Sequence, residues 1–209
     1  MMFRSCISIL LSCVVFTACG LMKQSSGKPL GPQDYLKWYT SADYPYRDTV
    51  VENGITYILE RLPAEVEIAR NLQSGRITAE EAKESYASQR DEKNLTYQLI
   101  VQLPGVGKDI YNYNVKEGES SSDRASYFAF GMKKDLLLLT GPVDTIDCSG
   151  LITERGLSNF PRSKFSMDFG GADFEQATQL LFKDRYLSEK LISFDLKPFQ
   201  KKVPKLTIK

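Results

Sequence analysis

The chain has 209 residues, of which 42% are apolar and 25% charged, with 27 basic against 26 acidic side chains. This composition is ordinary for one folded domain, and it excludes both intrinsic disorder and a protein with several membrane spans. The even charge balance gives no reason to expect nucleic acid as a partner. The sequence contains no histidine, which removes the commonest general base and metal ligand from any proposed chemistry.

The first eighteen residues have the pattern of an export signal. Arg4 precedes a largely apolar stretch from Ile7 to Phe16, which is too short to cross a bilayer because a transmembrane helix needs about 20 residues. Small residues then lead to Cys19, as at a signal-peptide cleavage site. We therefore expect residues 1–18 to be a signal peptide and the mature protein to run from Cys19 to Lys209.

The end of this segment, Thr17-Ala18-Cys19, resembles the lipobox of bacterial lipoproteins. The resemblance implies a diacylglycerol on the Cys19 thiol and an acylated amino group, so the membrane is the first expected partner. Several acyl chains hold a protein on a membrane far more firmly than one. Gly20 stands where some bacteria place an inner-membrane retention Asp, which favours the periplasmic face of the outer membrane. An ordinary secretory leader is the alternative.

Residues 19–33 are rich in Gly, Ser, Lys and Pro and poor in large apolar side chains, which predicts a flexible tether. Residues 34–209 contain no internal repeat, low-complexity tract or linker. They are therefore expected to form a single globular domain.

The first predicted element is a β-hairpin from 47 to 62. Asn53-Gly54 supplies the two positive φ angles of a type I′ turn between apolar strands. Pro63 then opens a helix that ends near Ser74, with Gly75 as its stop signal. A second helix is expected from Thr78 to Lys93, because Thr78 and Glu81 have the spacing of a capping box.

Apolar residues stand at every second position from 95 to 103, opposite Thr96, Gln98, Ile100 and Gln102. This alternation predicts a half-buried strand and is the clearest strand signal of the chain. A short helix capped by Ser122 is expected at 122–132, followed by a strand at 135–140 whose four consecutive leucines indicate burial on both faces.

Residues 165–169 are expected to form a further strand, residues 177–182 and 190–196 a hairpin, and Leu206 and Ile208 a final edge strand. Together the elements predict an α+β fold. It is expected to be a mostly antiparallel sheet or sandwich of six to eight strands, with two helices inserted between the second and third strands.

Five aromatic residues stand within twelve positions directly after the expected tether: Tyr35, Trp38, Tyr39, Tyr44 and Tyr46. Exposed Tyr and Trp rings can bind a protein partner or stack on a sugar. The helical spacing of Tyr35, Leu36 and Tyr39 favours instead a short helix that buries the rings against the sheet. Packing is the favoured interpretation, and partner binding by this Tyr35–Tyr46 cluster stays open.

Catalytic and metal motifs are not recognisable. Cys148 is the lone cysteine of the mature chain apart from Cys19, and without a cationic partner it is expected to be buried and inert. Zinc is not expected in the absence of histidine. The loop acids Asp144, Asp147, Asp168 and Asp173 lack calcium-loop spacing. We therefore expect no catalytic residue, cofactor or metal, although two carboxylates for glycoside hydrolysis could be brought together by the fold alone.

From Glu52-Asn53-Gly54-Ile55 to the closing segment 202–209, the order of elements is similar to a family of uncharacterised lipoproteins of the Bacteroidota. That resemblance implies an outer-membrane lipoprotein and no known activity. The leading hypothesis is a non-enzymatic protein that binds or scaffolds another envelope component, a protein or a glycan. The alternatives are a carboxylate-dependent glycan hydrolase and a sugar- or small-ligand-binding module that uses the aromatic cluster, so enzymatic activity is left open.

Overall fold

The computed structural model describes residues 28–42, 44–91, 94–105, 109–141, 144–154, 162–172, 175–200 and 204–209. The predicted signal peptide, Cys19 and residues 20–27 of the predicted tether lie outside them. Within the described ranges, no helix has both the length and the apolar character needed to cross a membrane.

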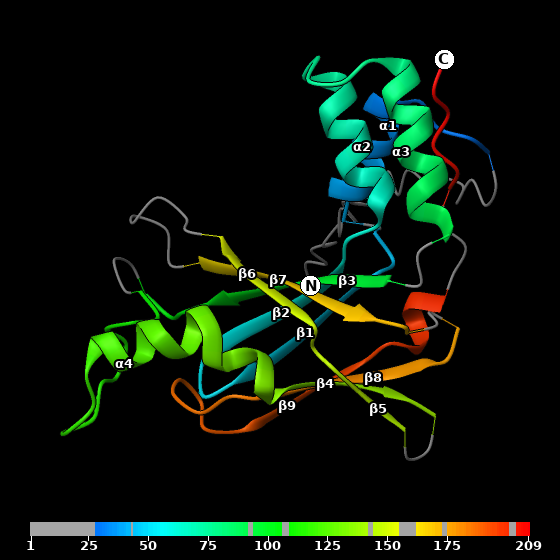
Figure 1. Cartoon of the computed structure of the whole chain (residues 1–209). Helices are drawn as coiled ribbons and strands as arrows, with labels where there is room; N and C mark the ends of the chain where they lie inside the picture. Colours follow the sequence, from blue (N-terminus) through cyan, green and yellow to red (C-terminus); the bar gives the residue numbers. More distant parts are fainter. Residues whose placement is uncertain are drawn as a thin grey trace, which may run out of the picture.

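Two antiparallel sheets enclose the core (Figure 1). The five-stranded sheet has the order β1 (Arg47–Glu52), β2 (Ile55–Arg61), β3 (Asn94–Gln102), β7 (Arg162–Gly170) and β6 (Gly150–Glu154). The four-stranded sheet has the order β5 (Thr145–Asp147), β4 (Leu136–Thr140), β8 (Ala177–Lys183) and β9 (Leu191–Asp195). The predicted α+β class is confirmed, and the short strands β5 and β6 are additions that the sequence did not indicate.

The hairpin prediction is confirmed in detail. Asn53 and Gly54 join β1 to β2 with φ angles of 51° and 78°, and the strands pair in register from Glu52 opposite Ile55 to Arg47 opposite Glu60. The turn chemistry therefore set the register of the first two strands, as expected for a two-residue loop.

The two helices α2 (Ala64–Gln73) and α3 (Ala79–Asp91) lie between β2 and β3 in the chain, as predicted. The Thr78 N–H donates to Glu81 Oε2 (2.7 Å) and the Glu81 N–H donates to Thr78 Oγ1 (3.3 Å), which is the reciprocal capping box. Helix α1 (Pro32–Thr40) precedes them in the chain, and the three stand together beside one end of the five-stranded sheet (Figure 1).

The predicted helix at 122–132 starts earlier and changes its winding. Helix α4 (Ser121–Ser126) is capped by Ser120 rather than Ser122, because the Ser120 hydroxyl accepts from the Asp123 N–H (3.0 Å). The chain continues as a π-helical turn, η1 (Tyr127–Gly131), and a 3₁₀ turn, η2 (Met132–Asp135), before β4.

Two strand predictions need correction. In β4, Leu136 and Leu138 are buried but Leu137 and Leu139 are only half-buried, because they lie on the outer face of the four-stranded sheet. The predicted burial on both faces is therefore incomplete. At the C-terminus, Leu206 forms an isolated parallel bridge with Leu30 in place of the predicted edge strand.

The bridge brings the end of the predicted tether into the fold. The Leu30 N–H donates to the Lys205 carbonyl (2.9 Å), and the Thr207 N–H donates to the Leu30 carbonyl (2.8 Å). The domain therefore begins at about Leu30, a few residues before the predicted boundary.

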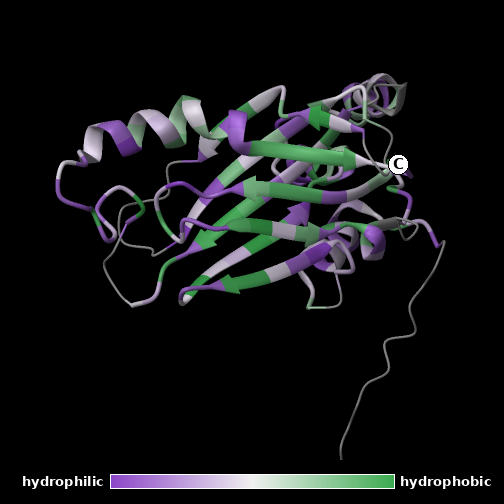
Figure 2. Ribbon diagram, turned by 90° about the horizontal axis from the view of Figure 1, so that it is seen from below, coloured by the Kyte–Doolittle hydropathy of each residue, from purple (hydrophilic) through white to green (hydrophobic). Residues whose placement is uncertain are grey.

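The core fills the space between the two sheets. Apolar residues alternate with polar ones along the strands (Figure 2), and in β3 the alternate residues Tyr97, Leu99 and Val101 are completely buried. Gln98 and Ile100 on the other face of β3 are buried as well, so the prediction of a half-buried strand is wrong. Tyr57 of β2 meets Phe182 of β8 with ring centroids 6.3 Å apart, which joins the sheets. Each such large side chain contributes about 1.5–3 kcal/mol when it leaves water.

Candidate functional site

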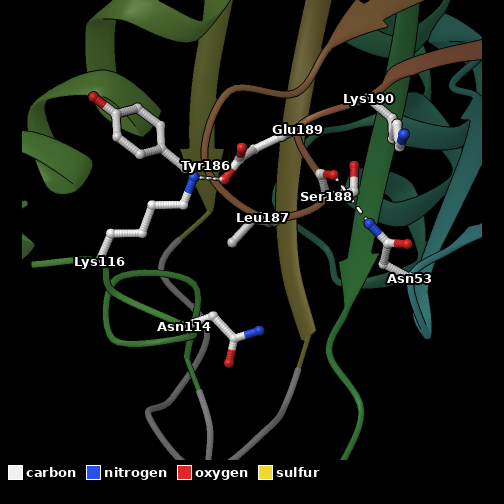
Figure 3. Close-up of a pocket in the computed structure, with 8 residues that line it drawn as sticks. All are labelled: Asn53, Asn114, Lys116, Tyr186, Leu187, Ser188, Glu189 and Lys190. Atoms are coloured by element: carbon white, nitrogen blue, oxygen red, sulfur yellow. Dashed lines mark hydrogen bonds and ion pairs between the residues drawn. The ribbon is translucent and has the colours of Figure 1, made fainter.

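Three loops meet at the end of the sandwich that lies away from α1–α3 (Figure 1). They are the β1–β2 turn, the segment 109–120 that precedes α4, and the segment 184–190 between β8 and β9. A shallow hollow of about 450 Å³ lies between them (Figure 3), which we call the loop groove. It is lined by Asn53, Asn114, Lys116, Tyr186, Leu187, Ser188, Glu189 and Lys190.

The backbone around the loop groove adopts demanding conformations. Asn53, Asn114 and Glu189 have φ angles of 51°, 47° and 57°, and they are the non-glycine residues with positive φ in the described part of the chain. Asn tolerates this region, but it costs a residue such as Glu on the order of 1–2 kcal/mol. Conformations of this kind persist only where the surroundings enforce them, and they cluster at functional sites.

Asp184 fixes the loop 184–190 from inside. Its side chain is buried, and its Oδ2 accepts from the Tyr57 hydroxyl (2.5 Å), the Ser188 N–H (2.7 Å) and the Ser188 hydroxyl (2.9 Å). Its Oδ1 accepts from the N–H groups of Tyr186 and Leu187, each at 3.1 Å. The hydrogen bonds from these five donors offset the free-energy cost of removing the Asp184 carboxylate from water. They also hold the loop in one well-defined shape.

Arg124 fixes the opposite loop. Its side chain has no exposed surface, and the guanidinium donates to the carbonyls of Tyr113 (2.5 Å) and Asn114 (3.1 Å) and to Glu119 Oε2 (2.6 Å). The hydrogen bond from Arg124 lowers the pKa of the Glu119 carboxyl. The same guanidinium lies 5.4 Å from the centre of the Tyr186 ring. Arg124 thus links the 109–120 loop to the 184–190 loop.

Neighbouring contacts hold Tyr186 and Arg185 in place. Arg185 donates to both carboxylate oxygens of Asp135, at 2.5 and 2.6 Å, which is the bidentate geometry that makes such pairs specific. The rings of Tyr186 and Tyr127 meet edge to face with centroids 4.8 Å apart. Tyr127 and Arg124 both contact the Tyr186 ring, so this ring packs against side chains of the protein itself.

The side chains that face solvent in the groove carry charge and amide groups. Lys116 forms an ion pair with Glu189 across the groove (Figure 3), and the Asn53 amide donates to the Ser188 carbonyl (3.1 Å). Within the described ranges, Lys190 makes no ion pair and the Asn114 side chain makes no hydrogen bond. One cation and one amide are therefore available to a ligand.

The predicted aromatic cluster lies elsewhere, between α1 and the sheet. Tyr35, Tyr39, Tyr44 and Tyr46 are buried and only Trp38 is half-buried. The Trp38 and Tyr44 rings meet edge to face at 5.1 Å, and the Tyr44 hydroxyl donates to the Arg61 carbonyl (2.6 Å). The cluster attaches α1 to the sheet, so its four tyrosines offer a partner almost no accessible ring surface.

The other predicted residues are not brought together. Cys148 is buried, and burial raises the pKa of its thiol to about 11. Asp168 accepts from the Thr96 hydroxyl (2.7 Å), whereas Cys19 and Asp173 lie outside the described residues. In the part of the chain that the structure describes, no three metal-ligating side chains form a group. Glu189 is the one carboxylate in the groove lining, so the paired acids of the hydrolase alternative are not found there.

The comparisons with known proteins do not indicate a function for this chain. No protein-family model matches the chain, and no curated protein matches its sequence. A crystal structure of a protein of unknown function from Burkholderia pseudomallei K96243 is similar over 80% of this chain and 91% of that chain, with 12% sequence identity and a TM-score of 0.38. At this level the similarity supports no argument about function.

Proposed function

We propose that this protein is a non-enzymatic lipoprotein of the bacterial outer membrane, anchored through Cys19 on the periplasmic side, which binds another envelope component through the loop groove. The observation that carries the binding role is the fixed shape of the two groove loops. Buried Asp184 and Arg124 hold them with five and four polar contacts. A pre-shaped surface binds at lower entropic cost than a mobile one.

The chemistry of the lining supports binding rather than catalysis. Ser188 is buried and its hydroxyl donates to Asp184 (2.9 Å), but that carboxylate already accepts four other hydrogen bonds. It is therefore a poor base for activating a nucleophile. Glu189 is neutralised by Lys116. The remaining groups, an ammonium and amides, can form hydrogen bonds with a ligand.

Site-specific photocrosslinking in cells tests the binding role. We would place a photoreactive side chain at Lys116 or Lys190 in the groove, and as a matched control at Lys83, an exposed lysine of α3. The expected result is a light-dependent adduct at the two groove positions and none at Lys83, with the adducts lost in Asp184→Asn. Equal adducts at all three positions, or none in the groove, would contradict the proposed binding site.

The anchor is tested separately with Cys19→Ser. Fractionation of cells fed a radiolabelled fatty acid should show the natural chain labelled and in the outer-membrane fraction. The variant should be unlabelled and absent from that fraction. A natural chain that stays membrane-bound with its leader removed but carries no acyl label would show that the lipoprotein assignment is wrong.

A further inference from the structure

One side of the sandwich carries an edge strand of each sheet. Strand β1 ends the five-stranded sheet and β9 ends the four-stranded sheet, and in the described part of the chain no further strand pairs with either. Two long-range hydrogen bonds hold these strands side by side. The Asn53 amide donates to the Ser188 carbonyl (3.1 Å), and the Asp195 N–H donates to Asp48 Oδ2 (3.1 Å). We call this part of the surface the β1–β9 side.

The pairing of each edge strand with its inner neighbour shows which of its backbone groups point outward. Just before β1, the Arg61 N–H donates to the Tyr46 carbonyl (3.0 Å). Just after β9, the Leu196 N–H donates to the Thr178 carbonyl (3.0 Å). In an antiparallel pair, hydrogen-bonded residues alternate with residues whose backbone groups face the other side. The outward N–H groups are therefore those of Arg47, Thr49 and Val51 in β1 and of Leu191, Ser193 and Asp195 in β9.

One carboxylate occupies an outward donor on each strand. Asp48 stands opposite Leu59 in the pairing of β1 with β2, and Leu59 is completely buried, so Asp48 is on the core-facing side of β1. From there its Oδ1 accepts from the Thr49 N–H (2.8 Å) and its Oδ2 accepts from the Asp195 N–H (3.1 Å). A charge that points inward on an edge strand is one of the means by which proteins prevent pairing between sheet edges.

We infer that Asp48 keeps the β1–β9 side from pairing with the same strands of a second copy of this chain. An antiparallel β1–β1 pair centred on Thr49 would use all the outward groups of β1, and its two-fold symmetry would let both copies use the same groups. Its central hydrogen bonds need the Thr49 N–H, which Asp48 already occupies. This role concerns self-association and does not rest on the proposed function.

Size-exclusion chromatography with light scattering, over a series of concentrations of the protein purified from membranes in non-ionic detergent, tests the inference. The natural chain should stay monomeric, whereas Asp48→Ala should form dimers or larger species at the same concentrations. Each freed N–H group should raise the self-association constant about two- to tenfold. Asp109→Ala is the matched control, because Asp109 also accepts from two backbone N–H groups but lies in the loop before α4. It should behave like the natural chain.

Further variants separate strand pairing from other causes of association. Asp48→Asn removes the charge but keeps one carbonyl acceptor, so its self-association should lie between that of the natural chain and that of Asp48→Ala. Thr49→Pro added to Asp48→Ala removes the central outward N–H of β1 and should restore the monomer. Ser193→Pro is the equivalent change in β9. Proline is tolerated where the N–H of an edge strand faces solvent, and circular dichroism shows whether each variant is folded.

Three results would overturn the inference. The first is an Asp48→Ala variant that self-associates no more than the natural chain. The second is equal self-association of Asp48→Asn and Asp48→Ala, which would show that charge alone keeps the copies apart. The third is an Asp48→Ala oligomer that persists with both prolines present, because its contacts would then lie elsewhere. If Asp48→Ala does not fold, Asp48→Asn must still self-associate more than the natural chain, and a monomeric Asp48→Asn would refute the role of Asp48.

Discussion

Asp184→Asn is the most informative single change in this fold. Both carboxylate oxygens accept hydrogen bonds, three at Oδ2 and two at Oδ1. The less costly orientation of an Asn amide directs its NH₂ group at the former Oδ2 partners, because the Tyr57 and Ser188 hydroxyls can turn to accept from it and only the Ser188 N–H loses its acceptor. That unsatisfied buried donor costs about 1–3 kcal/mol, and the other hydrogen bonds weaken because their acceptor is no longer charged, so we expect a loss of about 3 kcal/mol in the free energy of unfolding.

Urea unfolding followed by circular dichroism measures this loss. With a dependence of about 2 kcal/mol per molar urea, a change of about 3 kcal/mol lowers the midpoint by about 1.5 M. Asp109→Asn is the matched control, because Asp109 also accepts from two following N–H groups, those of Tyr111 and Asn112, but lies exposed. It should cost less than about 1 kcal/mol. Equal effects of the two substitutions would refute the role assigned to Asp184.

Four further outcomes follow from the contacts. Arg124→Met should cost about 3 kcal/mol or more, because it leaves two carbonyls and a carboxylate without their buried donor, and hydrogen exchange should show the 109–120 loop opening first. The pKa of the Glu119 carboxyl is lowered in the folded state. Its contribution to the stability of the fold is therefore present above its ordinary pKa of about 4.3 and is lost as the pH falls through the lowered value. Unfolding measured across the acid range should show this loss of stability in the natural chain and not in Arg124→Met. In a chain whose other cysteines are Ser, the Cys148 thiol, with a pKa of about 11, should react with a disulfide reagent at pH 8 only as fast as the protein unfolds; rapid labelling would contradict its burial. Phe128→Ala should lower the free energy of unfolding by about 3–5 kcal/mol. Phe130→Ala, at a side chain that is 76% exposed, should change it by less than about 0.5 kcal/mol, and urea unfolding measures both.

Local chemistry accounts for the elements that were predicted correctly. The Asn53-Gly54 turn, the Thr78–Glu81 capping box and the alternation in β3 each depend on residues within a few positions of one another. Short-range hydrogen bonds and side-chain periodicity are enough to define such elements. The strands β5 (TID) and β6 (GLITE) were missed because neither carries the apolar run or alternation that marked β4 and β9, which are equally short. Their conformation comes from pairing with β4 and β7.

The sequence by itself determined the composition class and most of the secondary structure, and it predicts an anchor at Cys19. Only the tertiary structure decided which side chains meet. Tyr57 and Asp184 are 127 residues apart, and the groove joins Asn53, Asn114 and Glu189 from three separate loops. The aromatic cluster was visible in the sequence but turned out to be buried, whereas the groove is built from scattered polar residues with no spacing to mark them. Contacts between distant segments depend on how the sheets pack, and packing leaves no local pattern that periodicity or turn chemistry can detect.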